Sequence, residues 1–136
     1  MTWQDFEVQA QQSMSKHYGK PLSKQRLAGL PKTFDLVSPR GEIVGDAKFL
    51  TLVGRTKLPP AKFMEIAGHV WLLEKTHASD RFLVFGNQRE VPEMWLQKYG
   101  QLATDVSFYF LHADGKLELL QSRKNLDATH NETNNP

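Results

Sequence analysis

The stretch FDLVSPRGEIVGDAKF, residues 34–49, contains two apolar runs separated by a turn sequence, and it decides the fold. In SPRGE, Pro39 fixes φ and Gly41 tolerates a positive φ, which is typical of a tight turn. The apolar runs on either side predict two strands, over residues 33–38 and 42–52. The sequence therefore predicts an antiparallel hairpin.

Three charged residues lie inside this hairpin: Asp35 in the first strand, and Asp46 and Lys48 in the second. Side chains at i and i+2 share a face of a strand, so Asp46 and Lys48 project together and Ala47 projects away. A turn of two or four residues places Asp35 opposite Asp46, with the two carboxylates about 5 Å apart on one face. A three-residue turn with a glycine bulge turns Asp35 away, and a second bulge at Gly45 could turn Asp46 back. Both routes can bring the two acids together, and we expect them to converge.

Two opposed acids require compensation, because like charges directly across a sheet destabilise it. A divalent cation neutralises both, and Asp35 and Asp46 are hard oxygen ligands of the kind that Mg²⁺ accepts. The backbone carbonyl of Ala47 lies between them, and Glu7, on the apolar stripe of the first predicted helix, can add a carboxylate. An ammonium group at Lys48 can help to deprotonate a water and can stabilise charge on phosphorus. These residues indicate phosphodiester hydrolysis.

The remaining elements follow from hydrophobic spacing, which predicts helices at 2–18, 60–77 and 91–103. Residues 81–86 are apolar on both faces, as in a central strand, and a last hairpin is expected over 106–120. Residues 19–32 are rich in Gly, Pro and Lys, and we expect an irregular connection there. The predicted order αββαβαββ indicates an α/β fold with a mixed central sheet of about five strands flanked by helices.

Composition limits the function classes. The 136 residues, 40% of them hydrophobic, suit one domain, at 1–121, and the polar segment 122–136 is expected to be a disordered tail. The chain has no cysteine, so a disulfide framework, a thiolate zinc site and a cysteine nucleophile are excluded. The first residues lack a basic start and an apolar run, which favours a cytoplasmic protein that does not enter a membrane.

The charge of the chain is unevenly distributed. Residues 16–62 hold ten of the seventeen Lys and Arg but three of the fifteen Asp and Glu. Such a face suits a polyanion, although a solvated lysine-rich surface would give the same excess. The basic residues that lead into the first strand are the predicted nucleic-acid contacts: Lys16, Lys20, Lys24, Arg26 and Lys32.

Asp35, then ten residues, then Asp46-Ala47-Lys48, on a hairpin that follows a helix bearing Glu7, resembles the PD-(D/E)XK nuclease superfamily. The likeness covers roughly residues 3–112 and includes the element order, although Phe34 stands where the name-giving proline would be. It implies a restriction-endonuclease-like core and a metal-dependent endonuclease that hydrolyses DNA. The two aspartates and the Ala47 carbonyl would bind Mg²⁺, with Mn²⁺ as a substitute. Lys48 would assist the water and Glu7 would complete the site.

The alternative is a module with the same fold that binds nucleic acid or a protein without catalysis. Glu65 and His69, four residues apart on the second long helix, are interpreted as a solvated pair. The wide apolar face of that helix, and the small size of the domain, make a homodimer or a place in a larger complex plausible.

Overall fold

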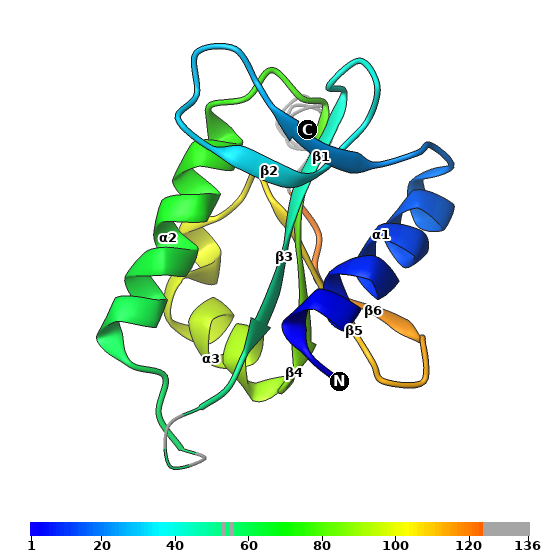
Figure 1. The fold of residues 1–136 in the computed structure, drawn as a ribbon. Coiled ribbons are helices and arrows are strands. Elements are labelled where there is room, and N and C mark those ends of the chain that lie inside the picture. Colours follow the sequence, from blue (N-terminus) through cyan, green and yellow to red (C-terminus); the bar gives the residue numbers. More distant parts are fainter. Residues whose placement is uncertain (53, 55, 124–136) are drawn as a thin grey trace, which may run out of the picture.

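The computed structural model describes residues 1–52, 54 and 56–123, and in this part of the chain three helices cover one six-stranded mixed sheet (Figure 1). The strands lie in sequence order across the sheet; β3, β4 and β5 are parallel, and the other pairs are antiparallel. The elements are α1 (Trp3–Tyr18), β1 (Ser23–Arg26), β2 (Thr33–Val37), β3 (Ile43–Leu50), α2 (Pro60–Glu74), β4 (Asp80–Asn87), α3 (Glu90–Tyr99), a short 3₁₀ turn η1 (Gly100–Leu102), β5 (Ser107–Leu111) and β6 (Leu117–Gln121). The α/β fold with a mixed sheet is therefore confirmed. Of the tail expected at 122–136, residues 124–136 lie outside the described residues.

One strand was not predicted. The segment 19–32, expected to be irregular, contains β1, so the sheet has six strands and the order is αβββαβαββ. All four residues of β1, Ser-Lys-Gln-Arg, are exposed, and the strand pairs with β2 at the edge of the sheet. A strand without apolar residues gives no periodic signal, and its pairing with β2 supplies the backbone hydrogen bonds instead.

The β2–β3 hairpin has the register of a four-residue turn. Ser38 N–H donates to the carbonyl of Ile43 at 2.9 Å, and Gly41 has the expected positive φ, 73°. Leu36 pairs with Gly45 and Val37 with Val44, so Asp35 and Asp46 are the next residues facing each other along the two strands. The register that opposes the two acids is therefore the observed one.

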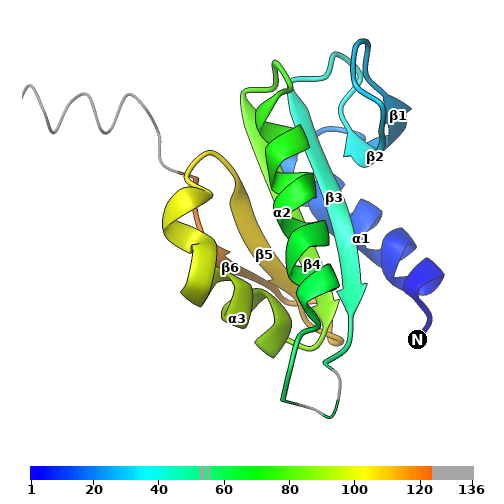
Figure 2. The ribbon, with the colours of Figure 1, turned by 90° about the vertical axis from the view of Figure 1, so that its left-hand side faces the viewer.

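Helix α1 covers one face of the sheet, and α2 and α3 cover the other (Figures 1 and 2). A capping box of Thr2 and Asp5 begins α1, and Gly19, with φ 70°, ends it. Phe6, Ala10 and Met14 of α1 pack with Leu36, Ile43 and Phe82. The larger core, between the sheet and α2 and α3, includes Phe34, Val44, Ile66, Phe85 and Trp95. Each face of the sheet is thus buried, as the sequence of β4 predicted.

Candidate active site

The two acids meet where the ladder between β2 and β3 ends. Asp35 N–H donates to Oδ1 of Asp46 at 3.0 Å, and Ala47 N–H donates to Oδ2 of Asp35 at 3.0 Å. Each carboxylate thus accepts a backbone hydrogen bond from the opposite strand at the point where the regular pairs stop. We call Asp35, Asp46 and Ala47 the β2–β3 junction.

The two carboxylates of the junction have different surroundings. The register of β2 against β1 shifts between the pairs Ser23–Val37 and Gln25–Phe34, so β2 has one extra residue there. Such a bulge sends two successive side chains to similar sides, and Asp35 and Leu36 both line a hollow beside α1. Asp46 projects toward α2 instead. Asp35 therefore lies beside the hollow next to α1, whereas Asp46 lies beside Lys32 and His69.

Asp46 is the most buried ionisable side chain of the junction, with 0% of its surface exposed. Burial, followed by the nearby Asp35 charge, raises the pKa of Asp46 to about 6. The ammonium of Lys32 lies 3.1 Å from Oδ2 and opposes this rise. Among the described residues, Oδ2 accepts no hydrogen bond of good geometry, so its contact with Lys32 is an ion pair.

Lys48 lies on the same side of β3 as Asp46 and contacts α2. Its Nζ is 3.4 Å from Nε2 of His69 and 3.6 Å from Oε2 of Glu65, and its side chain is 11% exposed. Burial lowers the pKa of Lys48. The alternation expected from the sequence, with Asp46 and Lys48 on one face and Ala47 on the other, is observed, because Ala47 packs against the α1-side core.

His69 is a residue of the site that the sequence interpretation missed. It was assigned with Glu65 to a solvated pair, yet its Nδ1 is buried and lies 3.8 Å from Oδ2 of Asp46. Burial, together with the charges of Lys48 and Lys32, lowers the pKa of His69 to about 4, so the imidazole is neutral at pH 7. The available signal was the spacing of two polar residues four apart on a helix that follows the Asp-Ala-Lys strand.

Glu7 reaches the other side of the junction. It lines the same hollow of about 320 Å³ as Asp35, together with Gln11 and Lys24. The Glu7 side chain is 23% exposed, and its Oε1 lies 3.2 Å from the ammonium of Lys24. The inward orientation expected from the helical stripe is therefore partial: Glu7 faces Asp35 across a hollow and does not enter the core.

The carbonyl of Ala47 points into the junction. The N–H and C=O groups of one strand residue point to the same side of the strand, and the Ala47 N–H points at Asp35. Carboxylate oxygens of Asp35 and Asp46 therefore lie near a main-chain oxygen.

This donor set fits a hard divalent cation. Within the described ranges, no three His, Asp or Glu side chains already converge on one point. Mg²⁺ needs fewer, since it typically keeps several waters and binds through one or two carboxylates. Oδ2 of Asp46 and the hollow between Asp35 and Glu7 offer acidic oxygens on either side of the Ala47 carbonyl.

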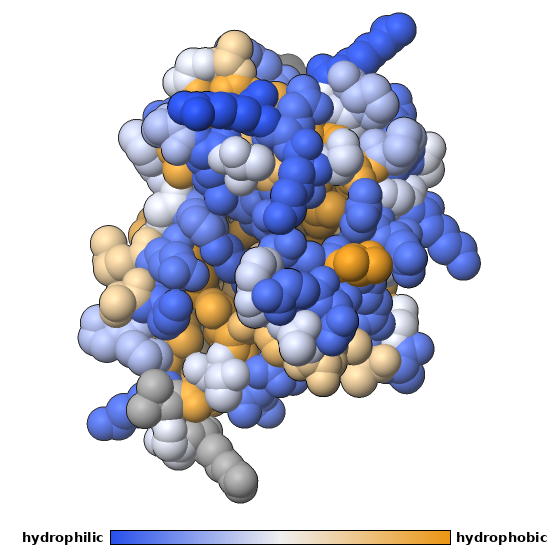
Figure 3. Space-filling model, viewed as in Figure 1, coloured by the Kyte–Doolittle hydropathy of each residue, from blue (hydrophilic) through white to orange (hydrophobic). Residues whose placement is uncertain are grey.

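The predicted nucleic-acid contacts fall into two groups. Lys24 and Lys32 are ion-paired with Glu7 and Asp46, as described above, and Lys20 lies 3.7 Å from Glu42. Lys16 and Arg26 are exposed. Figure 3 shows long hydrophilic side chains over β1 and β2, at the end of the molecule where most of these residues lie.

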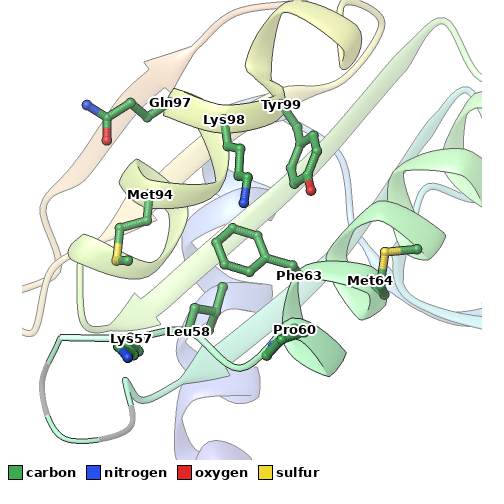
Figure 4. A pocket seen from close by; sticks show the side chains of 9 residues that line it. All are labelled: Lys57, Leu58, Pro60, Phe63, Met64, Met94, Gln97, Lys98 and Tyr99. Atoms are coloured by element: carbon green, nitrogen blue, oxygen red, sulfur yellow. The ribbon is translucent and has the colours of Figure 1, made fainter.

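A wide hollow of the described residues lies away from the acids, between α2 and α3. It has a volume of about 820 Å³, and Phe63, Met94 and Tyr99 are among the residues that line it (Figure 4). The ammonium of Lys98 lies 5.4 Å from the centre of the Phe63 ring. This groove contains no carboxylate, so it is a surface for packing or contact and no part of the acid site.

Comparison with known proteins adds a structural likeness and no sequence match. No protein-family model and no curated protein sequence matches the chain. The structure of SfsA from Pyrococcus furiosus in complex with Ca²⁺ aligns with 86% of this chain and 60% of that chain, with 13% sequence identity and a TM-score of 0.44. The chain thus spans less than two thirds of that protein. The assignment of function rests on the geometry of the site. Separately, no helix in the described part of the chain is long and apolar enough to span a bilayer.

Proposed function

We propose that the protein is a metal-dependent nuclease of the PD-(D/E)XK type that hydrolyses phosphodiester bonds in DNA. The observation that carries the proposal is the β2–β3 junction, where Asp35 and Asp46 each accept a backbone hydrogen bond from the other strand. A buried lysine, Lys48, lies two residues beyond Asp46 on the same face. Two acids and a lysine with a lowered pKa, at the open end of a strand pair, suit this chemistry.

The residues of the junction and Lys48 have different roles in the proposed reaction. Asp35, Asp46 and the Ala47 carbonyl would hold Mg²⁺, or Mn²⁺ in its place, with Glu7 contributing directly or through water. A bound divalent cation supplies Lewis-acid polarisation of the phosphoryl oxygens and activates water. Lys48 would orient the attacking water and donate a hydrogen bond to the developing negative charge. Burial lowers the pKa of Lys48, which makes proton transfer from the water to this side chain easier than to an exposed lysine.

His69 and Glu65 hold Lys48 from the α2 side. Lysine has a long flexible stem, and the contacts at 3.4 Å and 3.6 Å restrict where its Nζ lies. A neutral imidazole at His69 accepts a hydrogen bond from the ammonium without adding a charge to the site.

One observation favours the alternative, a binding module without catalysis. Glu7 and Asp46 already have lysine partners, Lys24 and Lys32, so two of the three acids have a counter-ion without a metal. If these pairs are permanent, the basic surface can bind nucleic acid while the acids are only structural. The two functions differ in whether a divalent cation binds and in whether DNA is cut.

The test is incubation of the purified chain with plasmid, linear duplex, single-stranded and branched DNA, in Mg²⁺, Mn²⁺ or EDTA. The nuclease proposal expects cleavage with either metal and none in EDTA. Asp46→Asn and Lys48→Ala are each expected to lower the rate by about 100-fold or more. Both variants keep a side chain of similar or smaller volume at a position outside the two apolar cores.

Matched controls come from the turn between β5 and β6. Asp114→Asn and Lys116→Ala make the same chemical changes at exposed residues and are expected to leave cleavage unchanged. Absence of cleavage under every condition, or variants at the junction that cut as well as the wild type, would sink the nuclease proposal and leave the binding module.

A further inference from the structure

The carboxylates on the two sides of the β2–β3 junction are each neutralised by a lysine from one short segment. Lys24 is in β1, and Lys32 is the last residue before β2. Their ammonium groups lie 3.2 Å from Oε1 of Glu7 and 3.1 Å from Oδ2 of Asp46, respectively. The segment at the edge of the sheet therefore places the Lys24 ammonium on the α1 side of the site and the Lys32 ammonium on the α2 side.

Lys32 is placed as a removable counter-ion. Its side chain is 16% exposed. Its Nζ lies 5.5 Å from the centre of the Phe34 ring and 3.1 Å from Oδ2 of Asp46. It precedes β2, and turning its side chain outward changes only side-chain torsions and breaks no backbone hydrogen bond. It contacts the same Oδ2 atom of Asp46 that has no hydrogen bond of good geometry.

Lys24 has the equivalent place on the α1 side. Its side chain is 59% exposed, and it lines the hollow between Glu7 and Asp35. A divalent cation held by these acids would lie beside the ammonium groups, and like charges at such distances repel strongly when water is partly excluded. The metal and the two ammonium groups therefore compete for the same oxygens.

We propose that Lys24 and Lys32 exchange partners during binding: they neutralise Glu7 and Asp46 in the free protein, and they contact nucleic-acid phosphates once a divalent cation occupies the carboxylates. The inference rests on the proposed function, because it takes the same acids to be metal ligands. It adds that the two lysines link metal binding to phosphate binding. Metal would release the ammonium groups, and phosphates are the anions that then receive them.

The first experiment follows the lysines in the wild-type chain and so needs no variant to fold. An amine-reactive reagent labels the protein without metal and with Mg²⁺, and mass spectrometry measures the rate at each lysine. Labelling of Lys32 is expected to become several-fold faster with Mg²⁺. A short DNA duplex, added in the Lys48→Ala background to prevent cutting, is expected to slow it again. Lys20 and Lys116, outside the site, are internal controls whose rates should not change with Mg²⁺.

The second experiment uses Lys32→Met and Lys24→Met, with Lys116→Met as the matched control and circular dichroism to verify folding. Calorimetry is expected to show Mg²⁺ binding to Lys32→Met tighter by about ten-fold, because one nearby like charge is gone. Each site variant is expected to bind a DNA duplex more weakly, with the salt dependence reduced by about one phosphate contact. A Lys32→Met variant that binds Mg²⁺ no more tightly than wild type would contradict the exchange.

The outcomes separate this inference from the nuclease proposal. If Mg²⁺ binds and the labelling rate of Lys32 does not change, the exchange is overturned. The nuclease proposal is then decided by the DNA cleavage assay alone. Faster labelling of Lys32 with Mg²⁺ and slower labelling with DNA support the exchange. If the wild type then cuts no DNA in the cleavage assay, the exchange stands and hydrolysis is contradicted. Absence of Mg²⁺ binding by calorimetry overturns both.

Discussion

Replacing Asp46 by Asn should stabilise the metal-free protein. Burial raises the pKa of Asp46 from 3.8 to about 6, so the folded state favours the protonated form. A rise of about 2 units, at about 1.36 kcal/mol per unit, means that ionising Asp46 costs the fold roughly 3 kcal/mol. A group with a raised folded pKa contributes stability below its unfolded pKa and loses it as the pH rises through the folded pKa. The cost is therefore absent near pH 4 and complete above pH 6 or so.

The net gain is smaller than this cost. Asn retains an Oδ1 that can accept the Asp35 N–H, so the junction hydrogen bond survives. Lys32 loses its partner, although its ammonium can reach water along a flexible stem. We expect about 2 kcal/mol of net stabilisation above pH 7, a rise in Tm of roughly 6 °C for a domain of this size.

His69 complicates the pH profile of the wild type. Burial lowers its pKa to about 4, so its contribution to stability is lost as the pH falls from 6.5 toward 4. Over the same window, the contribution of Asp46 changes in the opposite direction. The two trends offset each other in the wild type, so the informative quantity is the difference between variant and wild type at each pH.

Urea unfolding in EDTA, from about pH 4 to about pH 8, measures this difference. The stabilisation by Asp46→Asn should be near zero at the acid end, grow through pH 5 and 6, and level off above. Asp114→Asn, in the exposed β5–β6 turn, should show no such trend. A wild type at least as stable as Asp46→Asn at pH 8, or a difference that does not depend on pH, would refute the reasoning from burial.

Three further predictions test packing and the site. Gly45→Ala should destabilise the fold by about 2 kcal/mol, because the new Cβ would meet the buried Phe82 ring. Gly68→Ala, which has open space around it in α2, should stabilise the fold by about 0.5 kcal/mol or more. Urea unfolding measures both changes, and equal effects would contradict the packing. Glu7→Gln should weaken Mg²⁺ binding at least about ten-fold in calorimetry, and unchanged affinity would remove Glu7 from the site. His69→Gln should lower kcat more than it raises KM, because it frees the lysine of the site without touching substrate; a change in KM alone would contradict this positioning role.

The hairpin could be predicted because its signals are local. Pro39 and Gly41 define the turn, and the turn length fixes the register that opposes Asp35 and Asp46. The alternation along β3 then follows from the period of a strand. No contact with a distant part of the chain is needed for any of these steps.

The bulge beside Asp35 could not be predicted, because it depends on β1. The extra residue of β2 appears only in its pairing with β1, and β1 has no apolar residue to reveal it. Without that strand, the bulge beside Asp35 has no signal in the sequence. A bulge is a property of two paired strands, and a sequence shows it only when both strands are recognised.

The role of His69 was hidden for a related reason. The sequence places Glu65 and His69 on one side of a helix, but the rotation of α2 over the sheet decides whether that side meets Lys48 or water. The rotation is set by the packing of Ile66, Val70 and Leu73 into the core. Because this packing fixes the rotation of α2, the His69 imidazole points at β3 and contacts Lys48.

The burial of Asp46 is itself an argument about function. A structural role in the junction needs only the oxygen that accepts the Asp35 N–H, and Asn supplies that oxygen without a charge. Burial of the ionised carboxylate lowers the stability of the free protein, and the ion pair with Lys32 offsets only part of this cost. Its distinctive property is attraction for a cation at Oδ2, which Lys32 satisfies in part. An ion pair in which the aspartate is fully buried and the lysine is 16% exposed is a weak source of stability, which supports the proposal that Asp46 serves an exchangeable cation.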